Sequence, residues 1–200
     1  YDGPIAQLLA ASIQPILLVT DWPTTWGYTP WAANCSVLTA VGLDGLQAFL
    51  HAAMQRYPSC YFQMGNECDS YLPSPDGPCG GGSFGNTMPE WGMPANWGPI
   101  AYVDVLRRAW LAKNDSGSSA SIVLAGVSAD DCFTPDQQPI DTGHLVPGGP
   151  GFNGKWLRAV LDLGAADYFE KAAFHHYHHY RHAWETPVMQ GGLLPKVEAW

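Results

Sequence analysis

The residues best suited to chemistry in this sequence end an apolar, aromatic-rich run at positions 61–67 (YFQMGNE). A run of this length, bounded by turn residues, predicts a buried strand. Asn66 and Glu67 would then lie at its carboxyl end, where parallel α/β folds collect their reactive groups. Apolar surroundings raise the pKa of a carboxyl group, so Glu67 could give and take a proton near neutral pH. The Asn66 amide could hold a hydroxyl group beside it.

Aromatic side chains are abundant, with nine Trp and nine Tyr. Several of the tryptophans lie in stretches rich in Pro and Gly rather than in periodic segments. Such residues either fill the mouth of a fold or offer flat apolar faces on which a sugar ring can stack. Trp22 and Trp26 are the candidates for contact with a carbohydrate.

Five of the seven histidines lie in one run at 175–182 (HHYHHYRH). Clustered His can bind a metal together with carboxylates such as Asp21 or Glu67, which would suit a metal-dependent hydrolase. The other interpretation is that His175 and Tyr177 line a substrate site at the end of a strand and that a polar loop follows. We favour the second interpretation, because the early histidine pair of metal-dependent barrel hydrolases is not visible, and we predict no metal or other cofactor.

Charge is sparse, at 14% of residues, and the net charge is −9. A nucleic-acid partner would require a basic face to meet phosphates, and docking on anionic lipid would require one too. No apolar run approaches the roughly 20 residues that span a bilayer. The composition therefore favours a carbohydrate substrate over nucleic acid or a membrane, and it leaves the oligomeric state open.

The five cysteines show no CxxC spacing, which argues against a structural zinc site. Cys68 and Cys79 bracket one loop, and a disulfide between them would indicate an oxidising compartment. Secretion or an extracellular location is the resulting expectation. The sequence begins without Met, so we expect that the natural N-terminus is missing.

Helical and apolar segments alternate along the chain. Non-alternating apolar strands between helices predict a parallel sheet covered by helices, here in a single domain over residues 1–200. The expected strands are 13–20, 60–66, 121–128 and 167–177, and the expected helices are 2–12, 44–56 (capped by Asp44, with Phe49 among its buried residues), 99–113, 155–163 and 191–200.

Two parallel architectures compete for this pattern. A doubly wound dinucleotide-binding sheet would carry a glycine fingerprint directly after a strand, but Gly80 to Gly85 lie deep inside a loop. A (β/α)8 TIM barrel needs about 250 residues, and its long loops all follow strands, as they do here. The expected fold is therefore α/β, a partial (β/α)8 barrel of approximately strands 3 to 6 with their helices. Strands 13–20 and 167–177 would be its unpaired edges.

Three short segments resemble the retaining glycoside hydrolases built on (β/α)8 barrels. The segment 65–67 (GNE) is similar to the end of the fourth strand in that superfamily, where the Glu is the acid/base. The segment 16–23 (ILLVTDWP) looks like the third strand and its loop, and 173–177 (AFHHY) looks like the sixth. The resemblance implies that Glu67 is the acid/base and Asn66 a sugar-hydroxyl ligand. It also implies that His175 and Tyr177 line the sugar site.

The chain departs from that family at the nucleophile, a Glu that ends the seventh strand. Glu185 lies in an expected loop, Glu198 in an expected helix, and Glu170 at the wrong end of the sixth strand. The nucleophile is therefore expected beyond Trp200, and the 200-residue chain alone is expected not to hydrolyse glycosides. A non-catalytic carbohydrate-binding module would use the same aromatic loops, although such modules are more often all-β.

Overall fold

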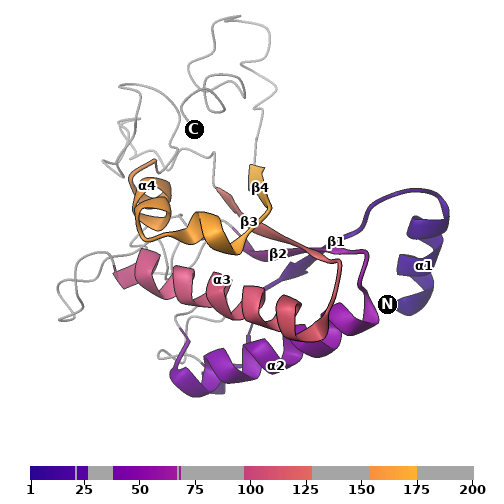
Figure 1. Ribbon diagram of the computed structural model, residues 1–200, viewed down its shortest axis with the longest axis horizontal. Coiled ribbons are helices and arrows are strands. Elements are labelled where there is room, and N and C mark those ends of the chain that lie inside the picture. The colour runs from indigo at the N-terminus through magenta and orange to yellow at the C-terminus, as the bar shows by residue number, and fades with distance from the viewer. Residues whose placement is uncertain (21, 27–37, 67, 69–96, 128–153, 175–200) are drawn as a thin grey trace, which may run out of the picture.

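The computed structural model describes residues 1–20, 22–26, 38–66, 68, 97–127 and 154–174 (Figure 1). Within these ranges the chain forms a four-stranded, fully parallel sheet in the order β1-β2-β3-β4. The predicted α/β class and parallel sheet are confirmed. The strands are β1 (Ile16–Val19), β2 (Tyr61–Asn66), β3 (Ser121–Val127) and β4 (Lys171–Phe174).

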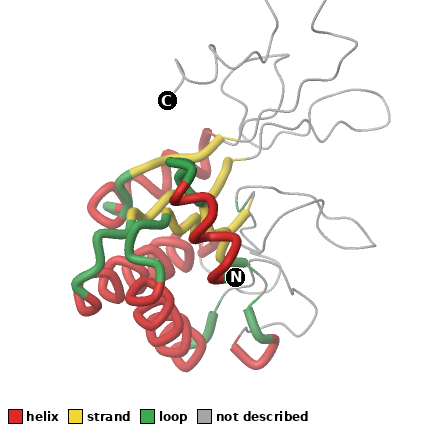
Figure 2. Tube along the Cα trace, turned by 90° about the vertical axis from the view of Figure 1, so that its right-hand side faces the viewer, coloured by secondary structure: helices red, strands yellow, loops and turns green. Residues whose placement is uncertain are grey.

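Helices connect the strands and form a layer along the sheet. In Figure 1, α2 and α3 run side by side beneath the strands, and α2 packs on α3, which packs on α4. Figure 2 shows the same helical layer from the side. The helices are α1 (Asp2–Ala10), α2 (Ala40–Arg56), α3 (Trp97–Ser116) and α4 (Gly154–Asp162), with short 3-10 turns η1 (Thr24–Trp26) and η4 (Ala165–Tyr168).

The hydrophobic core lies between the sheet and this helical layer. From α2 it takes a stripe at every fourth position, Gly42, Leu46, Leu50 and Met54, because residues four apart share one face of a helix. Full burial of each leucine contributes about 1.5–3 kcal/mol. Two rows of paired strand residues meet the helices: Leu17, Phe62 and Ile122, and next to them Val19, Met64 and Leu124.

The uninterrupted apolar runs indicate strands that are buried along their length, which is right for β2 and β3 but wrong for β1. Residues 62–65 and 122–126 are buried without interruption. In β1, Ile16 is 58% exposed and Leu18 is 48% exposed. The reason is position, since β1 lies at the edge of the sheet and these two side chains point away from the helices. The predicted edges are confirmed, because β1 and β4 are the outer strands of the described sheet.

The strand expected at 13–20 begins only at Ile16, because the preceding residues close α1. Ser12 has a left-handed φ of 59°, and the Ile13 N–H donates to the Leu8 carbonyl at 2.9 Å. This is the hydrogen bond of a Schellman-type helix end. The fourth strand likewise starts at Lys171 rather than at Asp167, since Asp167 lies in the turn η4.

Asp44 does not cap α2, contrary to the expectation. The helix begins at Ala40, and the Thr39 hydroxyl accepts a hydrogen bond from the Gly42 N–H at 3.1 Å. Both the N–H and the hydroxyl of Thr39 donate to the Trp26 carbonyl, at 2.8 and 3.0 Å. Asp44 instead pairs with Arg108 of α3 at 3.0 Å. Phe49, also expected in the core, is 53% exposed.

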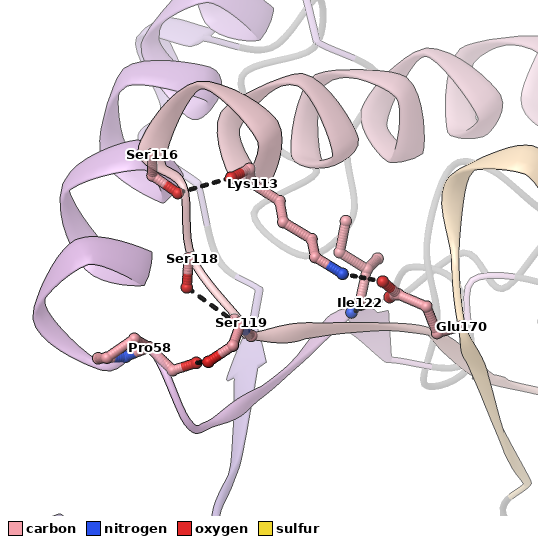
Figure 3. Close-up of polar contacts among 8 residues, drawn as sticks. Pro58, Lys113, Ser116, Ser118, Ser119, Ile122 and Glu170 are labelled. Atoms are coloured by element: carbon pink, nitrogen blue, oxygen red, sulfur yellow. Dashed lines mark hydrogen bonds and ion pairs between the residues drawn. The ribbon is translucent and has the colours of Figure 1, made fainter.

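The amino-terminal edge of the sheet is held by hydrogen bonds from side chains to the backbone (Figure 3). The Glu170 carboxylate accepts the Ile122 N–H at 2.7 Å and pairs with Lys113, whose pKa is lowered by burial. The Ser118 hydroxyl donates to the Met54 carbonyl, and the Ser119 hydroxyl donates to the Pro58 carbonyl. These contacts join α2, α3 and the starts of β3 and β4.

Candidate functional site

The candidate site begins where β2 ends. The last residue of β2 is Asn66, half-buried and opposite Gly126 of β3. The chain position of the Asn-Glu pair at a strand's carboxyl end is therefore as predicted. Glu67, the next residue, lies outside the described residues, and its role as the acid stays a prediction.

The strand changes course one residue before Asn66. Gly65 has a φ of 87°, in the left-handed region that a residue with a Cβ adopts only at a cost. The register between β2 and β3 runs regularly from Tyr61 to Met64 and then passes to Asn66, so the ladder skips Gly65. The Gly65 carbonyl accepts a hydrogen bond from the Gln63 side chain at 3.1 Å. A glycine at this point lets the main chain turn before the Asn-Glu pair.

A tyrosine from α3 joins the two central strands at the same level. The Tyr102 hydroxyl donates to the Met64 carbonyl at 2.9 Å and accepts from the Ala125 N–H at 2.7 Å. Its side chain has no exposed surface. Because Met64 is paired with Leu124, a regular parallel ladder would send the Ala125 N–H toward the Met64 carbonyl. The hydroxyl therefore lies between two groups that a regular ladder would join directly.

The two candidate tryptophans follow the carboxyl end of β1. Trp22 is 5% exposed and belongs to the hydrophobic core cluster. Trp26 is half-buried, and its ring lies so close to α2 that a Cβ at Gly45 would come within 2.7 Å of it. Both indoles thus contribute to packing, which is the first of the two roles weighed for loop tryptophans. Sugar stacking by either one stays a prediction.

His175 and Tyr177, expected beside the sugar, lie outside the described residues, as does Cys79 of the proposed disulfide. Cys68 is buried in the core cluster. In the described part of the chain, no three His, Cys, Asp or Glu side chains gather as metal ligands would. Its acidic residues lie in helices, in η4 or, for Glu170, just before β4 at the amino-terminal edge, where the sequence placed that residue.

Sequence reasoning missed Gly65 and Tyr102. Gly65 carried a usable signal, since a glycine inside an otherwise bulky strand often marks a bulge or bend. Tyr102 carried none beyond its place on an apolar helix face, because its role depends on which carbonyl and N–H the packed strands bring to its hydroxyl.

No sequence model of a known protein family matches this chain, and a search of curated proteins gave no match. Among the helices that the structure describes, none combines the length and the apolar character needed to cross a membrane.

Proposed function

We propose that this chain is part of a retaining glycoside hydrolase in which Glu67 is the acid/base. The observation that carries the proposal is the end of β2, a central strand of a parallel sheet, at Asn66, directly before Glu67 in the chain. The carboxyl end of such a strand is the common place for catalytic groups in parallel α/β enzymes.

The order of the strands supports a (β/α)8 barrel as the complete fold. Connections between parallel strands are almost always right-handed, so a sheet built in sequential order carries its helices on one face. A doubly wound sheet reverses its order at a switch point and carries helices on both faces. The sequence β1-β2-β3-β4 contains no reversal, and α2, α3 and α4 pack against one another in turn.

In the proposed reaction Glu67 protonates the glycosidic oxygen as the bond to the leaving group breaks, while a second carboxylate attacks the anomeric carbon. Glu67 then takes a proton from the water that hydrolyses the glycosyl-enzyme, and the nucleophile leaves as a carboxylate. We place that nucleophile after Trp200. Asn66 would hold a hydroxyl of the sugar, and His175, Tyr177, Trp22 and Trp26 would line the site.

The experiment compares the product of the complete gene with the 200-residue chain on a panel of alkyl and aryl glycosides. We expect turnover by the longer protein only. Glu67→Gln should lower its kcat about 10²–10⁴-fold on alkyl glycosides, whose leaving groups need protonation. On aryl glycosides with acidic leaving groups kcat/KM should fall much less, because bond cleavage then needs no acid, while kcat stays low because hydrolysis of the glycosyl-enzyme still lacks its base.

Asp167→Asn is the control, because Asp167 is an exposed residue of η4. It should leave the turnover of alkyl and of aryl glycosides unchanged. Robust turnover by the 200-residue chain that Glu67→Gln abolishes would refute the external nucleophile. Sugar binding without turnover in the longer protein would instead indicate a non-catalytic carbohydrate-binding domain.

A further inference from the structure

We propose that Asn114, in the last turn of α3, is an attachment site for an N-linked oligosaccharide. The segment 114–116 reads Asn-Asp-Ser, and Asn-x-Ser, where x is not Pro, is the acceptor triplet for N-glycosylation in secreted proteins. The inference goes beyond the proposed hydrolase activity and does not depend on it. It depends on the expected secretion of the protein, for which it provides a test at a single residue.

The first step is exposure. Asn114 is an exposed residue of α3, which ends two residues later at Ser116. The main-chain carbonyl of Asn114 accepts the Gly117 N–H at 3.2 Å, where the chain leaves the helix. Gly117 has a φ of 65°, and a Cβ built on it would meet nothing within 4 Å beyond its neighbours in the chain. The end of α3 therefore has open space for a bulky, hydrated group.

The second step is the position of Asn114 relative to the candidate site. The end of α3 lies at the amino-terminal edge of the sheet, where Ser119 donates to the Pro58 carbonyl just before β2 (Figure 3). Asn66 ends β2 at the carboxyl edge. The 7 residues of β3 separate the two edges by about 20 Å. A glycan on Asn114 would thus be attached at the edge opposite Asn66.

The third step concerns when the glycan is added. In the formed helix Asn114 and Ser116 are two positions apart, so they point in nearly opposite directions. The Ser116 hydroxyl also donates to the Lys113 carbonyl at 2.8 Å, a local bond to the backbone that serine commonly makes (Figure 3). A transferase that must contact the Asn amide and the Ser hydroxyl together therefore acts before the last turn of α3 closes, during synthesis in the secretory pathway.

The reaction is a substitution at the anomeric carbon of an oligosaccharide that is linked to a lipid diphosphate. The side-chain nitrogen Nδ2 of Asn114 forms a bond to that carbon, and the bond from the carbon to the diphosphate oxygen breaks. The lipid diphosphate leaves with the electron pair of the broken bond, and a base takes one proton from the amide. No oxidant or reductant is needed.

The test is to express the 200-residue chain behind a secretory leader in a eukaryotic cell and to map the Asn114 peptide by mass spectrometry. A peptide N-glycosidase removes the glycan and converts the linked amide to an acid, which marks the modified residue in the fragment spectrum. Mapping by residue is required because the sequence holds a second triplet of this kind at 34–36 (NCS).

We expect glycan on Asn114 in the unaltered chain and none in Ser116→Ala, which keeps the asparagine but removes the hydroxyl that the transferase recognises. Ser116→Thr is the matched control, since it keeps a hydroxyl at the third position, and the glycan should remain at equal or higher occupancy. Should Ser116→Ala fail to be secreted, Asn114→Gln removes the acceptor instead and should lower the mass of the intact protein by one glycan.

An Asn114 peptide without glycan in the secreted chain would overturn the proposal. Glycan that persists on Asn114 in Ser116→Ala, or an intact mass that Asn114→Gln leaves without the loss of a glycan, would overturn it as well. The same peptide is then mapped in the protein made by its own organism. Absence of glycan there would refute Asn114 as a natural site and would leave the hydrolase proposal untouched, because no step of the proposed reaction involves this edge of the sheet.

Discussion

Gly65 is the residue on which the geometry of the candidate site depends most directly. Its φ of 87° falls where a Cβ meets the neighbouring backbone, so the turn before Asn66 is available to glycine at little cost. Tyr102 secures the carbonyl just ahead of it. A conformation that is unfavourable for other residues is thus placed one residue before the proposed sugar ligand.

Gly65→Ala should destabilise the chain by about 1–2 kcal/mol, the cost of a left-handed conformation for a residue with a Cβ. Urea unfolding measures the change. Gly3→Ala is the matched control, because Gly3 lies in α1 with open space where its Cβ would stand. The control should be neutral or slightly stabilising, since alanine is the better helix former. Equal stability of both variants would contradict the strain assigned to Gly65.

At this scale the sequence predicted the chain position of Asn66 but not the hydroxyl bridge behind it. Asn66 follows from a local pattern, an apolar run that ends in polar residues. The bridge requires that Tyr102, Met64 and Ala125 meet, and they come from three separate elements. Packing was one of the two roles weighed for Trp26, but its particular contact with glycines of α2 could not be predicted, because it too joins separate elements.

Among the elements, α2 shows most clearly how a helix start is decided by tertiary contact. Thr39 caps the helix while also donating twice to the Trp26 carbonyl, so one residue joins η1 to α2. Arg108 then ties the exposed side of α2 to α3 through Asp44 and Gln47.

Thr39→Ala should cost about 1 kcal/mol of stability, the usual loss when a hydroxyl cap is removed. Asp44→Ala should cost a few tenths of that, because its ion pair with Arg108 is largely exposed and such pairs contribute little. Thermal or urea unfolding of both variants, with circular dichroism of the helices, provides the comparison. A larger loss for Asp44→Ala would restore that residue as the effective cap.

The type and order of the strands and of the helices between them could be predicted, whereas several of their ends and the short turns η1 and η4 could not. Hydrophobic runs and helical periodicity are local properties, so four strands and the helices between them were visible in the sequence. The ends depend on partners distant in the chain, as with Thr39 and Trp26, or on a closing turn, as with Ser12 and Ile13. The end of α4 is an exception, because it depends on a local residue: Gly164, at a φ of 83°, follows the helix.

At the scale of the whole molecule, the described sheet has two outer strands, and one of them, β1, exposes apolar residues. Ile16 and Leu18 of β1 are 58% and 48% exposed, and Ile13, just before the strand, is 53% exposed. An exposed apolar edge strand is a site at which sheets join one another. The other outer strand, β4, begins with the charged residue Lys171. Its Nζ lies 4.8 Å from the centre of the Tyr61 ring of β2.

We expect the 200-residue chain to self-associate at micromolar concentration through β1. Leu18→Lys should shift sedimentation toward monomer, because a charge on an edge strand opposes pairing. Phe49→Lys is the control. The exposed fraction of Phe49, 53%, is similar to that of Leu18, but Phe49 lies on α2 and not on an edge strand. A cooperative monomer at these concentrations would contradict the expected edge and weaken the case for a partial barrel.

The sequential strand order also bears on biosynthesis. Within the described sheet each strand pairs only with strands that are adjacent to it in the chain order, so β2, β3 and β4 each meet a neighbour that has already been translated. At about 5–20 residues per second, the roughly fifty residues of one strand–helix unit take several seconds to emerge, far longer than a helix needs to form. The described strands can therefore pair one after another during translation, with β2 pairing with β1 before β3 has left the ribosomal exit tunnel.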